Sequence, residues 1–321
     1  MNVLDKVVST GVVVGLAVLG ATACGAQTGK SASTSQPKSH VVKDSYGHSV
    51  RVPVDPKRVV APDFEVPLLV LGIKPAAQES TSGSQPEYEY LQPQLKGVPT
   101  VNFTGGLKPE DALKFNPDLI ILDNSNWVTT DLYKQFTKVA LTYEFNNTVS
   151  GSNPWPNHWR NDLLKLGKIF NKSTVAHQAI QNYDKQAAAA KVKVHQAIGD
   201  KSVALLYLSG KTLAVMGTGW WDSAPVLYDD LKLTPPAFSI GKSYDQISLE
   251  ELPKMKADYI FLIDADTSMS SNPLFSNPVW KNLSAVQQGH MFKVSGSSSF
   301  FGMGAITNAL TIKTVVKDLT K

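Results

Sequence analysis

Apolar residues along the chain gather into short continuous runs, each followed by turn residues and then by a helical pattern. In the first half the clearest runs lie at 58–61, 98–103, 118–122 and 139–143. Continuous apolar runs of this kind, separated by helices, are typical of parallel strands that helices cover on both faces. We therefore expect an α/β lobe in this half of the chain.

A second series of apolar runs follows at 203–208, 213–216, 258–263 and 291–294. The two halves also share one pattern, at 108–121 and 248–261: acidic residues open a short helix, a turn follows, and an aspartate precedes a buried strand. Similarity of this kind predicts a second lobe of like construction.

The longest helical pattern, from 159 to 198, lies between the two series and is interrupted near 171–173. Ser173 is a suitable N-cap for its second segment, in which Ala176, Ile180 and Tyr183 recur at helical spacing. At about 1.5 Å per residue, some 24 residues reach about 36 Å, enough to bridge two lobes. The predicted fold is two Rossmann-like α/β lobes, at 41–156 and 199–321, joined by a long connector helix within 157–198.

Composition agrees with a folded, two-domain protein of 321 residues, since 42% of the residues are hydrophobic and 18% are charged. The net charge of +4 comes from lysines that are scattered along the chain. Nucleic-acid binding is therefore not expected.

The single cysteine, Cys24, lies at the end of an apolar or small run at 7–23 that follows Lys6, and this pattern is typical of a signal peptide. The ending ATAC at 21–24 resembles the lipobox of bacterial lipoproteins. We expect a signal peptide at 1–23 and a lipidated cysteine with a flexible polar stalk at 24–40. The alternative is a cleaved, fully secreted protein with an incidental thiol. If Cys24 is an anchor, the folded part has no thiol for disulfides or metal sites.

Several segments then carry a family resemblance: VKDSYGHSVRVP at 42–53, PKRVV at 56–60, LGIKP at 71–75, the acid-led helix before NPDLI at 116–120, and VWKNL with GHMFKV at 279–294. In this order they resemble the substrate-binding lipoproteins of ABC importers, in the helix-linked class that captures ferric siderophores, haem and cobalamin. The last pair is similar to the ferric-hydroxamate receptors of Gram-positive bacteria.

The resemblance implies that the lobes face each other across a ligand cleft, with contacts from loops at the carboxyl ends of the strands. Open α/β sheets bind ligands at that place on physical grounds as well. It also implies a monomer anchored by lipid on the extracellular face of the cell membrane, and one docking carboxylate per lobe for the ABC permease. Glu110 and Glu250 occupy these positions; both are also acids at helix starts, where they complement the helix dipole.

Candidate ligand contacts are aromatic residues after strands, with one arginine at the start of the connector, where a guanidinium can stack or bond to chelate oxygens. Core packing and an ordinary surface position are the alternatives. The candidates are Phe64, Trp127, Tyr143, Arg160, Trp220, Trp221, Phe300 and Phe301.

The resemblance favours a hydroxamate chelate, but the chain departs from these receptors at two places. Asp222 stands where they have an arginine, and Phe300 or Ser299 stands where they have a tyrosine. A catecholate, as a trianion, fits worse in a chain with only three arginines. Haem and cobalamin are the alternatives within the same fold.

Binding without chemistry is the predicted activity, and no cofactor is expected. The six histidines are dispersed, so we predict no metal ligands. A secreted hydrolase is the rival from another class, but the sequence contains no Gly-x-Ser-x-Gly or His-Glu-x-x-His motif, and no Ser-x-x-Lys set with its companion Ser-Asp-Asn and Lys-Thr-Gly motifs.

Overall fold

The computed structural model describes residues 39–80, 86, 88–123, 128–146, 155–220, 222–265 and 272–321. The predicted signal peptide, Cys24 and nearly all of the stalk lie outside the described residues, as do Trp127 and Trp221. No helix in the described part of the chain is both long and apolar enough to cross a membrane.

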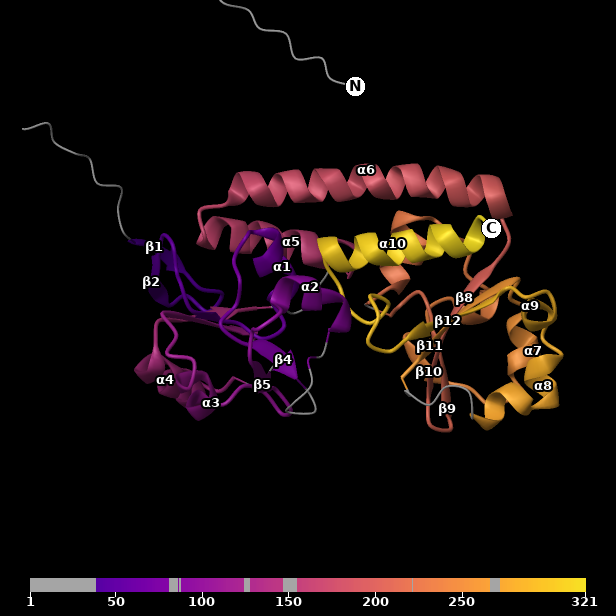
Figure 1. Cartoon of the computed structure of the whole chain (residues 1–321), viewed down its shortest axis with the longest axis horizontal. Helices are drawn as coiled ribbons and strands as arrows, with labels where there is room; N and C mark the ends of the chain where they lie inside the picture. Colours follow the sequence, from indigo (N-terminus) through magenta and orange to yellow (C-terminus); the bar gives the residue numbers. More distant parts are fainter. Residues whose placement is uncertain are drawn as a thin grey trace, which may run out of the picture. The chain divides into compact units, whose positions relative to one another are not determined.

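The N-terminal lobe contains a three-stranded parallel sheet in the order β3-β6-β7, a parallel pair β4-β5, and an antiparallel hairpin β1-β2 (Figure 1). All five residues of β6 are buried, as the continuous apolar run predicted. The strands are β1 (Ser39–Lys43), β2 (Ser49–Pro53), β3 (Val59–Val60), β4 (Gln78–Ser80), β5 (Thr100–Asn102), β6 (Leu119–Asp123) and β7 (Thr142–Phe145).

Short helices connect these strands. They are α1 (Glu65–Val70), a 3-10 turn (Glu89–Leu91), α2 (Gln92–Leu95), α3 (Pro109–Leu113) and α4 (Thr130–Val139). The strand predicted at 139–143 was placed too early, because α4 continues to Val139 and the strand begins at Thr142. Val139 and Ala140 pack with Phe136 in an apolar cluster, so their apolar character belongs to the helix end.

The C-terminal lobe has one five-stranded sheet in the order β10-β9-β8-β11-β12. Its strands are β8 (Val203–Ser209), β9 (Thr212–Met216), β10 (Tyr244–Gln246), β11 (Tyr259–Asp264) and β12 (Met291–Ser295). Around it lie a π-helical turn (Pro225–Asp230), 3-10 turns (Ala237–Ser239 and Pro273–Ser276), α7 (Leu252–Met255), α8 (Pro278–Lys281) and α9 (Ser284–Gln287).

This sheet is mixed rather than parallel throughout. β11 runs parallel to β8 and β12, whereas β9 is antiparallel to both β8 and β10. Only Gly210 and Lys211 separate β8 from β9. A connection this short can join only antiparallel strands, and Gly210 supplies the positive φ of 57° that the turn needs.

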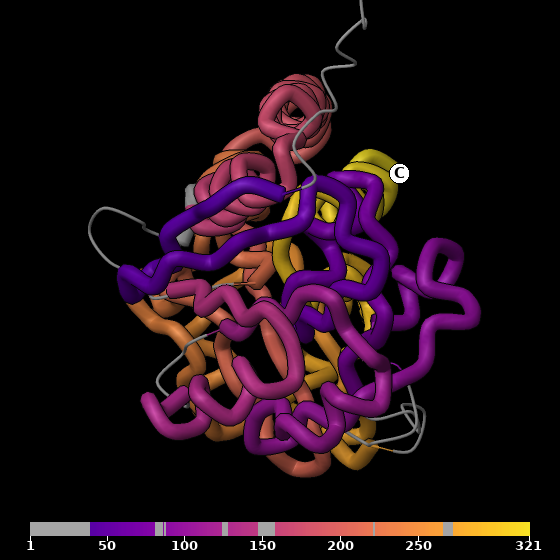
Figure 2. The backbone as a smooth tube through the Cα atoms, turned by 90° about the vertical axis from the view of Figure 1, so that its left-hand side faces the viewer, coloured from indigo at the N-terminus to yellow at the C-terminus, as the bar shows by residue number. Residues whose placement is uncertain are grey.

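Three long helices lie along one side of the two lobes: α5 (Trp155–Ile169), α6 (Ser173–Ile198) and α10 (Ala305–Leu319) (Figures 1 and 2). α6 is the predicted connector, and its 26 residues span about 39 Å. It starts at Ser173 itself, with Lys172 as the flanking residue, so the predicted N-cap is displaced by one position.

The C-terminal helix α10 packs along α6 and also contacts α1 of the N-terminal lobe. One apolar core runs from Ile121 in β6 through Ala187 in α6 to Phe261 in β11. The lobes therefore share packing along the helical side, and the connection between them is stiff.

Candidate functional site

A cavity of about 240 Å³ is lined by both lobes at the carboxyl ends of their strands. Its walls include residues 63–67 after β3, Asp123 at the end of β6, Asp222 after β9, and residues 302–305 after β12. Tyr88 and Tyr90 from the 3-10 segment, and residues of α5, complete the lining. This is where an open α/β fold is expected to bind a ligand.

The cavity is acidic. Among the lining residues that the structure describes there is neither a lysine nor an arginine, and His158 is the single group that can become a cation. The carboxylates on the wall are Asp63, Glu65, Asp123, Asp162 and Asp222. A low-dielectric cavity with this lining has a negative potential, which attracts cations and repels anions.

Glu65 is the first residue of α1, and only 1% of its surface is exposed. Its Oε1 accepts the backbone N–H of Glu79 at 2.8 Å, whereas Oε2 has no hydrogen-bond partner. Burial, together with the nearby charge of Asp63, raises the pKa of Glu65 to about 8. The carboxyl is therefore mostly protonated at neutral pH unless a cation approaches it.

Asp222 belongs to the other lobe and is also buried, with 6% of its surface exposed. Its Oδ2 has no hydrogen-bond partner. Burial raises the pKa of Asp222 to about 7, and the nearby Trp220 side chain offsets part of that rise. Each lobe thus contributes one buried carboxyl with unused acceptor capacity to the same cavity.

His158 and Asp162 form the wall on α5, one helical turn apart. His158 Nδ1 lies 3.1 Å from Asp162 Oδ2, and both side chains are almost completely buried. His158 can offset the charge of Asp162 only in its protonated form, so the acidic character of the cavity depends on the other acidic side chains of its wall.

The wall formed by residues 302–305 depends on two glycines. Gly302 has φ 154°, and a Cβ there would lie 2.7 Å from Tyr90 Oη. Gly304 has φ 123°, and its Cβ would lie 2.6 Å from Val66 Cγ1. Tyr90 Oη is also hydrogen-bonded to Thr307 Oγ1 at 3.1 Å, which joins the N-terminal lobe to α10. The loop is therefore held against the opposite lobe.

The structure places the predicted aromatic contacts in different surroundings. Phe64 lines the cavity and packs edge-on against Phe145, with centroids 5.0 Å apart. Tyr143 is 6% exposed and donates a hydrogen bond to the Lys43 carbonyl at 3.3 Å. Phe300 is 1% exposed and stacks on Phe261 in the core. In this conformation Tyr143 and Phe300 are therefore core residues.

Trp220 and Phe301 are brought together, with ring centroids 6.2 Å apart. Tyr207 and Tyr244 complete this aromatic cluster, which we call the C-lobe aromatic cluster (Tyr207, Trp220, Tyr244 and Phe301). Trp220 itself is 4% exposed, whereas Tyr244 is 40% exposed. The cluster adjoins the cavity through Asp222, two residues after Trp220.

Arg160 does not line the cavity. Its guanidinium bonds to Asp184 at 2.7 Å and to Asp230 at 3.2 Å, and it lies over the rings of Trp159 and Tyr183. Tyr183 Oη also donates to Asp230, at 2.5 Å. We call this arrangement the Arg160 network (Arg160, Tyr183, Asp184 and Asp230). All of these partners of the Arg160 guanidinium lie within the chain.

Glu110 and Glu250 are exposed, each in its own lobe. Glu110 lies in the first turn of α3, and Glu250 precedes α7. Backbone and Ser248 hydrogen bonds lower the pKa of Glu250, so it is ionised at neutral pH. Both side chains point to solvent, and the contacts of Glu250 are local hydrogen bonds at the start of its helix.

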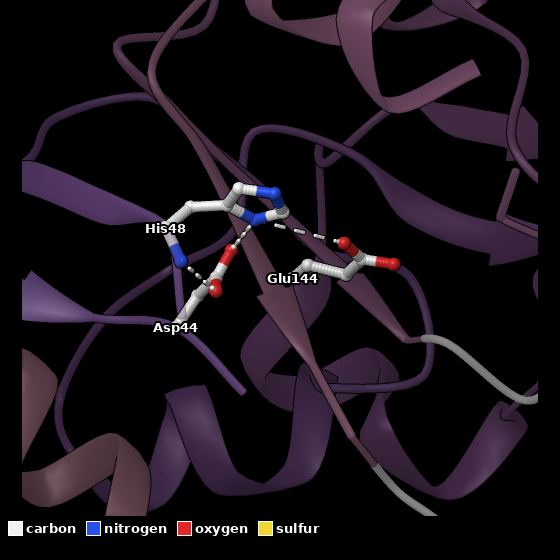
Figure 3. Close-up of side chains that lie close together, drawn as sticks. All are labelled: Asp44, His48 and Glu144. Atoms are coloured by element: carbon white, nitrogen blue, oxygen red, sulfur yellow. Dashed lines mark hydrogen bonds and ion pairs between the residues drawn. The ribbon is translucent and has the colours of Figure 1, made fainter. Parts of the chain in front are cut away.

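A separate group of possible metal ligands, which the sequence did not suggest, lies beside the β1-β2 hairpin (Figure 3). His48 Nδ1 is 2.7 Å from Asp44 Oδ2 and 4.0 Å from Glu144 Oε2. Such ligands suit Zn²⁺. However, Asp44 Oδ1 already accepts the backbone N–H groups of Tyr46 and His48, so the carboxylate also has a local role in closing the hairpin turn.

Comparison with known proteins decides the family. A family model described as periplasmic binding protein matches residues 68–296. The chain belongs to the periplasmic binding protein family. This membership makes it a binding protein and not an enzyme, as the sequence predicted.

The relatives of this periplasmic binding protein include the iron(3+)-hydroxamate-binding protein FhuD of Bacillus subtilis, which is 29% identical over 296 residues, or 87% of each chain. The probable siderophore-binding lipoprotein YfiY of the same organism is also 29% identical, over 87% of each chain. A crystal structure of a FhuD-fold component of a ferrichrome ABC transporter from B. subtilis has a TM-score of 0.73 and 27% identity. It covers 87% of this chain and 100% of that one. The predicted fold is confirmed.

The cavity acids were missed as a set from the sequence, although each has a local signal. Asp63, Asp123 and Asp222 all follow a strand or end one. Acids at the carboxyl ends of strands from both lobes would have been the feature to search for.

Proposed function

We propose that this protein captures a ferric siderophore outside the cytoplasm and delivers it to an ABC permease, and that the siderophore is of the hydroxamate type. The charge of the cavity is the observation that favours a hydroxamate over a catecholate chelate. Hydroxamate complexes of Fe³⁺ are neutral or cationic, because three singly charged groups balance the metal, whereas a triscatecholate complex is a trianion. A cavity with five acidic side chains and no lysine or arginine among its described lining residues disfavours the trianion.

The C-lobe aromatic cluster supports the same proposal. Two of its members, Trp220 and Phe301, lie within two residues of the cavity wall along the chain, and the ring of Tyr244 is exposed to solvent. An aromatic surface suits the apolar backbone of a hydroxamate chelate. Haem, with two carboxylates of its own, meets the same repulsion as a catecholate.

The remaining parts of the proposal concern the cell surface. The relative YfiY is described as a lipoprotein, and the lipobox-like ending at Cys24 supports a lipid anchor on the extracellular face of the membrane. Glu110 and Glu250 are the proposed contacts for the permease, since they are exposed acids and lie one on each lobe. The receptor acts as a monomer.

Titration of tryptophan fluorescence in the purified mature protein tests the choice of ligand. The dissociation constants for ferrichrome and ferrioxamine B should be at least about 100-fold lower than those for a ferric triscatecholate, haem or cobalamin. This ratio corresponds to a difference of about 2.7 kcal/mol in binding free energy. Preferred binding of the triscatecholate would contradict the hydroxamate assignment. Binding of none of the five ligands would contradict the siderophore function itself.

A further inference from the structure

The cavity is too small to enclose a whole chelate. Its 240 Å³ is below the roughly 300–1,000 Å³ of pockets that bury drug-sized ligands. The lining residues Asp222 and Gly302 lie within two residues of Trp220 and Phe301, which belong to the C-lobe aromatic cluster. The geometry suits one arm of a ligand whose bulk lies against the aromatic rings.

Two buried carboxyl groups on the cavity wall indicate which chemical group this arm of the ligand should bear. Glu65 Oε2 and Asp222 Oδ2 both lie on the cavity wall, both side chains are more than nine-tenths buried, and neither oxygen has a hydrogen-bond donor. Buried acceptors without donors are rare in folded proteins. A ligand that supplies donors and positive charge would satisfy both oxygens.

Tyrosine rings complete the surroundings of such a group. Tyr88 and Tyr90 line the cavity with centroids 5.7 Å apart, and Tyr90 is close enough to Glu65 and Asp222 for both charges to raise its pKa, after burial, which is the main cause. Aromatic faces attract cations. Acids and rings together form a cage for an organic cation.

We infer that this cavity is a subsite for a primary ammonium group on the chelate, held between Glu65 and Asp222 against Tyr88 and Tyr90. The inference rests on the proposed function and narrows its ligand to hydroxamate chelates that bear a free amine. An ammonium offers three hydrogen-bond donors and one positive charge, which matches the two open carboxylate oxygens.

Proton release is a consequence of this arrangement. The pKa values of about 8 for Glu65 and about 7 for Asp222 leave both carboxyls partly protonated at neutral pH. A bound ammonium favours their ionised forms and displaces protons. Affinity for an amine-bearing chelate should therefore rise between pH 6 and pH 8.5. The other titratable groups that face the two carboxyls are Asp63, Glu79, Tyr88, Tyr90, Asp123, His158 and Asp162.

The test compares ferrioxamine B, which has a free amine, with its N-acetylated form, which has the same iron centre and no charge on that arm. The wild-type protein should bind the amine form at least about tenfold more tightly, the effect of one good charge-assisted hydrogen bond. The double variant Glu65→Gln/Asp222→Asn should reduce this ratio to below about threefold. Asp131→Asn, at a carboxylate on α4 that is 88% exposed, is the matched control and should keep the wild-type ratio.

Calorimetry in two buffers of different ionisation enthalpy gives an independent measurement. At pH 7.5 the amine form should release protons on binding to the wild-type protein, and the acetylated form should not. The single variants are measured as well, so that a folding defect in the double variant does not decide the outcome.

A wild-type ratio near one, or a tenfold ratio that persists in the folded variants, overturns the ammonium subsite and leaves the siderophore function intact. If neither form of ferrioxamine nor ferrichrome binds, the proposed function fails instead.

Discussion

The Arg160 network and the interlobe cavity both bury acidic side chains, but only the network provides partners for all of them within the chain. In the network, the guanidinium contacts two aspartates and Tyr183 donates to Asp230, so the buried charges are matched within the chain. In the cavity, Glu65 Oε2 and Asp222 Oδ2 have no donor. The two regions lie on either side of α5, which supplies Arg160 to one and His158 to the other.

The difference separates structural charges from functional ones. A buried ion pair that the chain completes is part of the fold, and removing one partner leaves an uncompensated charge. A buried carboxyl that the chain leaves incomplete costs stability in the free protein. This cost is recovered only if a ligand donates hydrogen bonds to the open oxygen. Glu65 and Asp222 are therefore the acids that we assign to ligand binding.

The largest expected effect comes from breaking the matched region. Arg160→Met keeps most of the side-chain volume but leaves Asp230, whose side chain is only 14% exposed, without its cation. We expect a loss of about 2–4 kcal/mol in the free energy of unfolding, measured by urea denaturation. Asp184→Asn, at a position that is 49% exposed, is the control and should cost under about 1 kcal/mol. If Arg160→Met instead keeps full stability and loses chelate binding, Arg160 is a ligand contact, as the sequence suggested.

Neutralising the unmatched region should have an effect of intermediate size that depends on pH. In the folded protein the pKa of Glu65 is raised from 4.5 to about 8, so the folded state holds this proton more tightly than the unfolded chain. Its contribution to stability is fully present below about pH 4.5 and is lost as the pH rises to 8, with a slope of up to about 1.4 kcal/mol per pH unit.

Glu65→Gln cannot titrate and still accepts the Glu79 N–H, so it should flatten this part of the stability curve. The variant should match the wild type near pH 5 and exceed it at pH 8.5, as urea denaturation at several pH values would show. Glu89→Gln, at an exposed glutamate, serves as the control. If the variant is less stable than the wild type at pH 8.5, burial is not what raises the pKa of Glu65.

The smallest effect on stability is expected at the solvated acids. Glu110→Lys/Glu250→Lys should leave the thermal midpoint and the affinity for ferrioxamine B unchanged, because both side chains are exposed. Uptake of radioactive iron by cells should nevertheless be abolished if these acids contact the permease. Asp131→Lys on α4 should leave uptake intact. Uptake at the wild-type level in the double variant would remove Glu110 and Glu250 from the docking surface.

Much of the fold could be predicted because its signals are local. The buried run of β6 and the helical spacing of α6 depend on neighbours within a few residues. The errors arose where the decisive contact is not local to the pattern. The apolar pair at 139–140 serves the end of α4, and the direction of β9 is set by the two-residue turn before it.

The candidate site was predicted less well for the same reason. Phe64 was predicted as a ligand contact and lines the cavity, whereas Trp220, predicted in the same way, is buried beside it. Glu65 and Asp222 are 157 positions apart, and only the packing of the lobes brings them to one wall. The spacing of apolar and polar residues along the chain cannot predict a contact between positions so far apart.

The wall formed by residues 302–305 comes from the last twenty residues of the chain, together with the helix α10 that follows it. During synthesis Glu65 is therefore made long before Gly302 can reach Tyr90. The cavity is complete only after the whole chain has been translated, so a prematurely terminated chain lacks this wall and the helix that holds it in place.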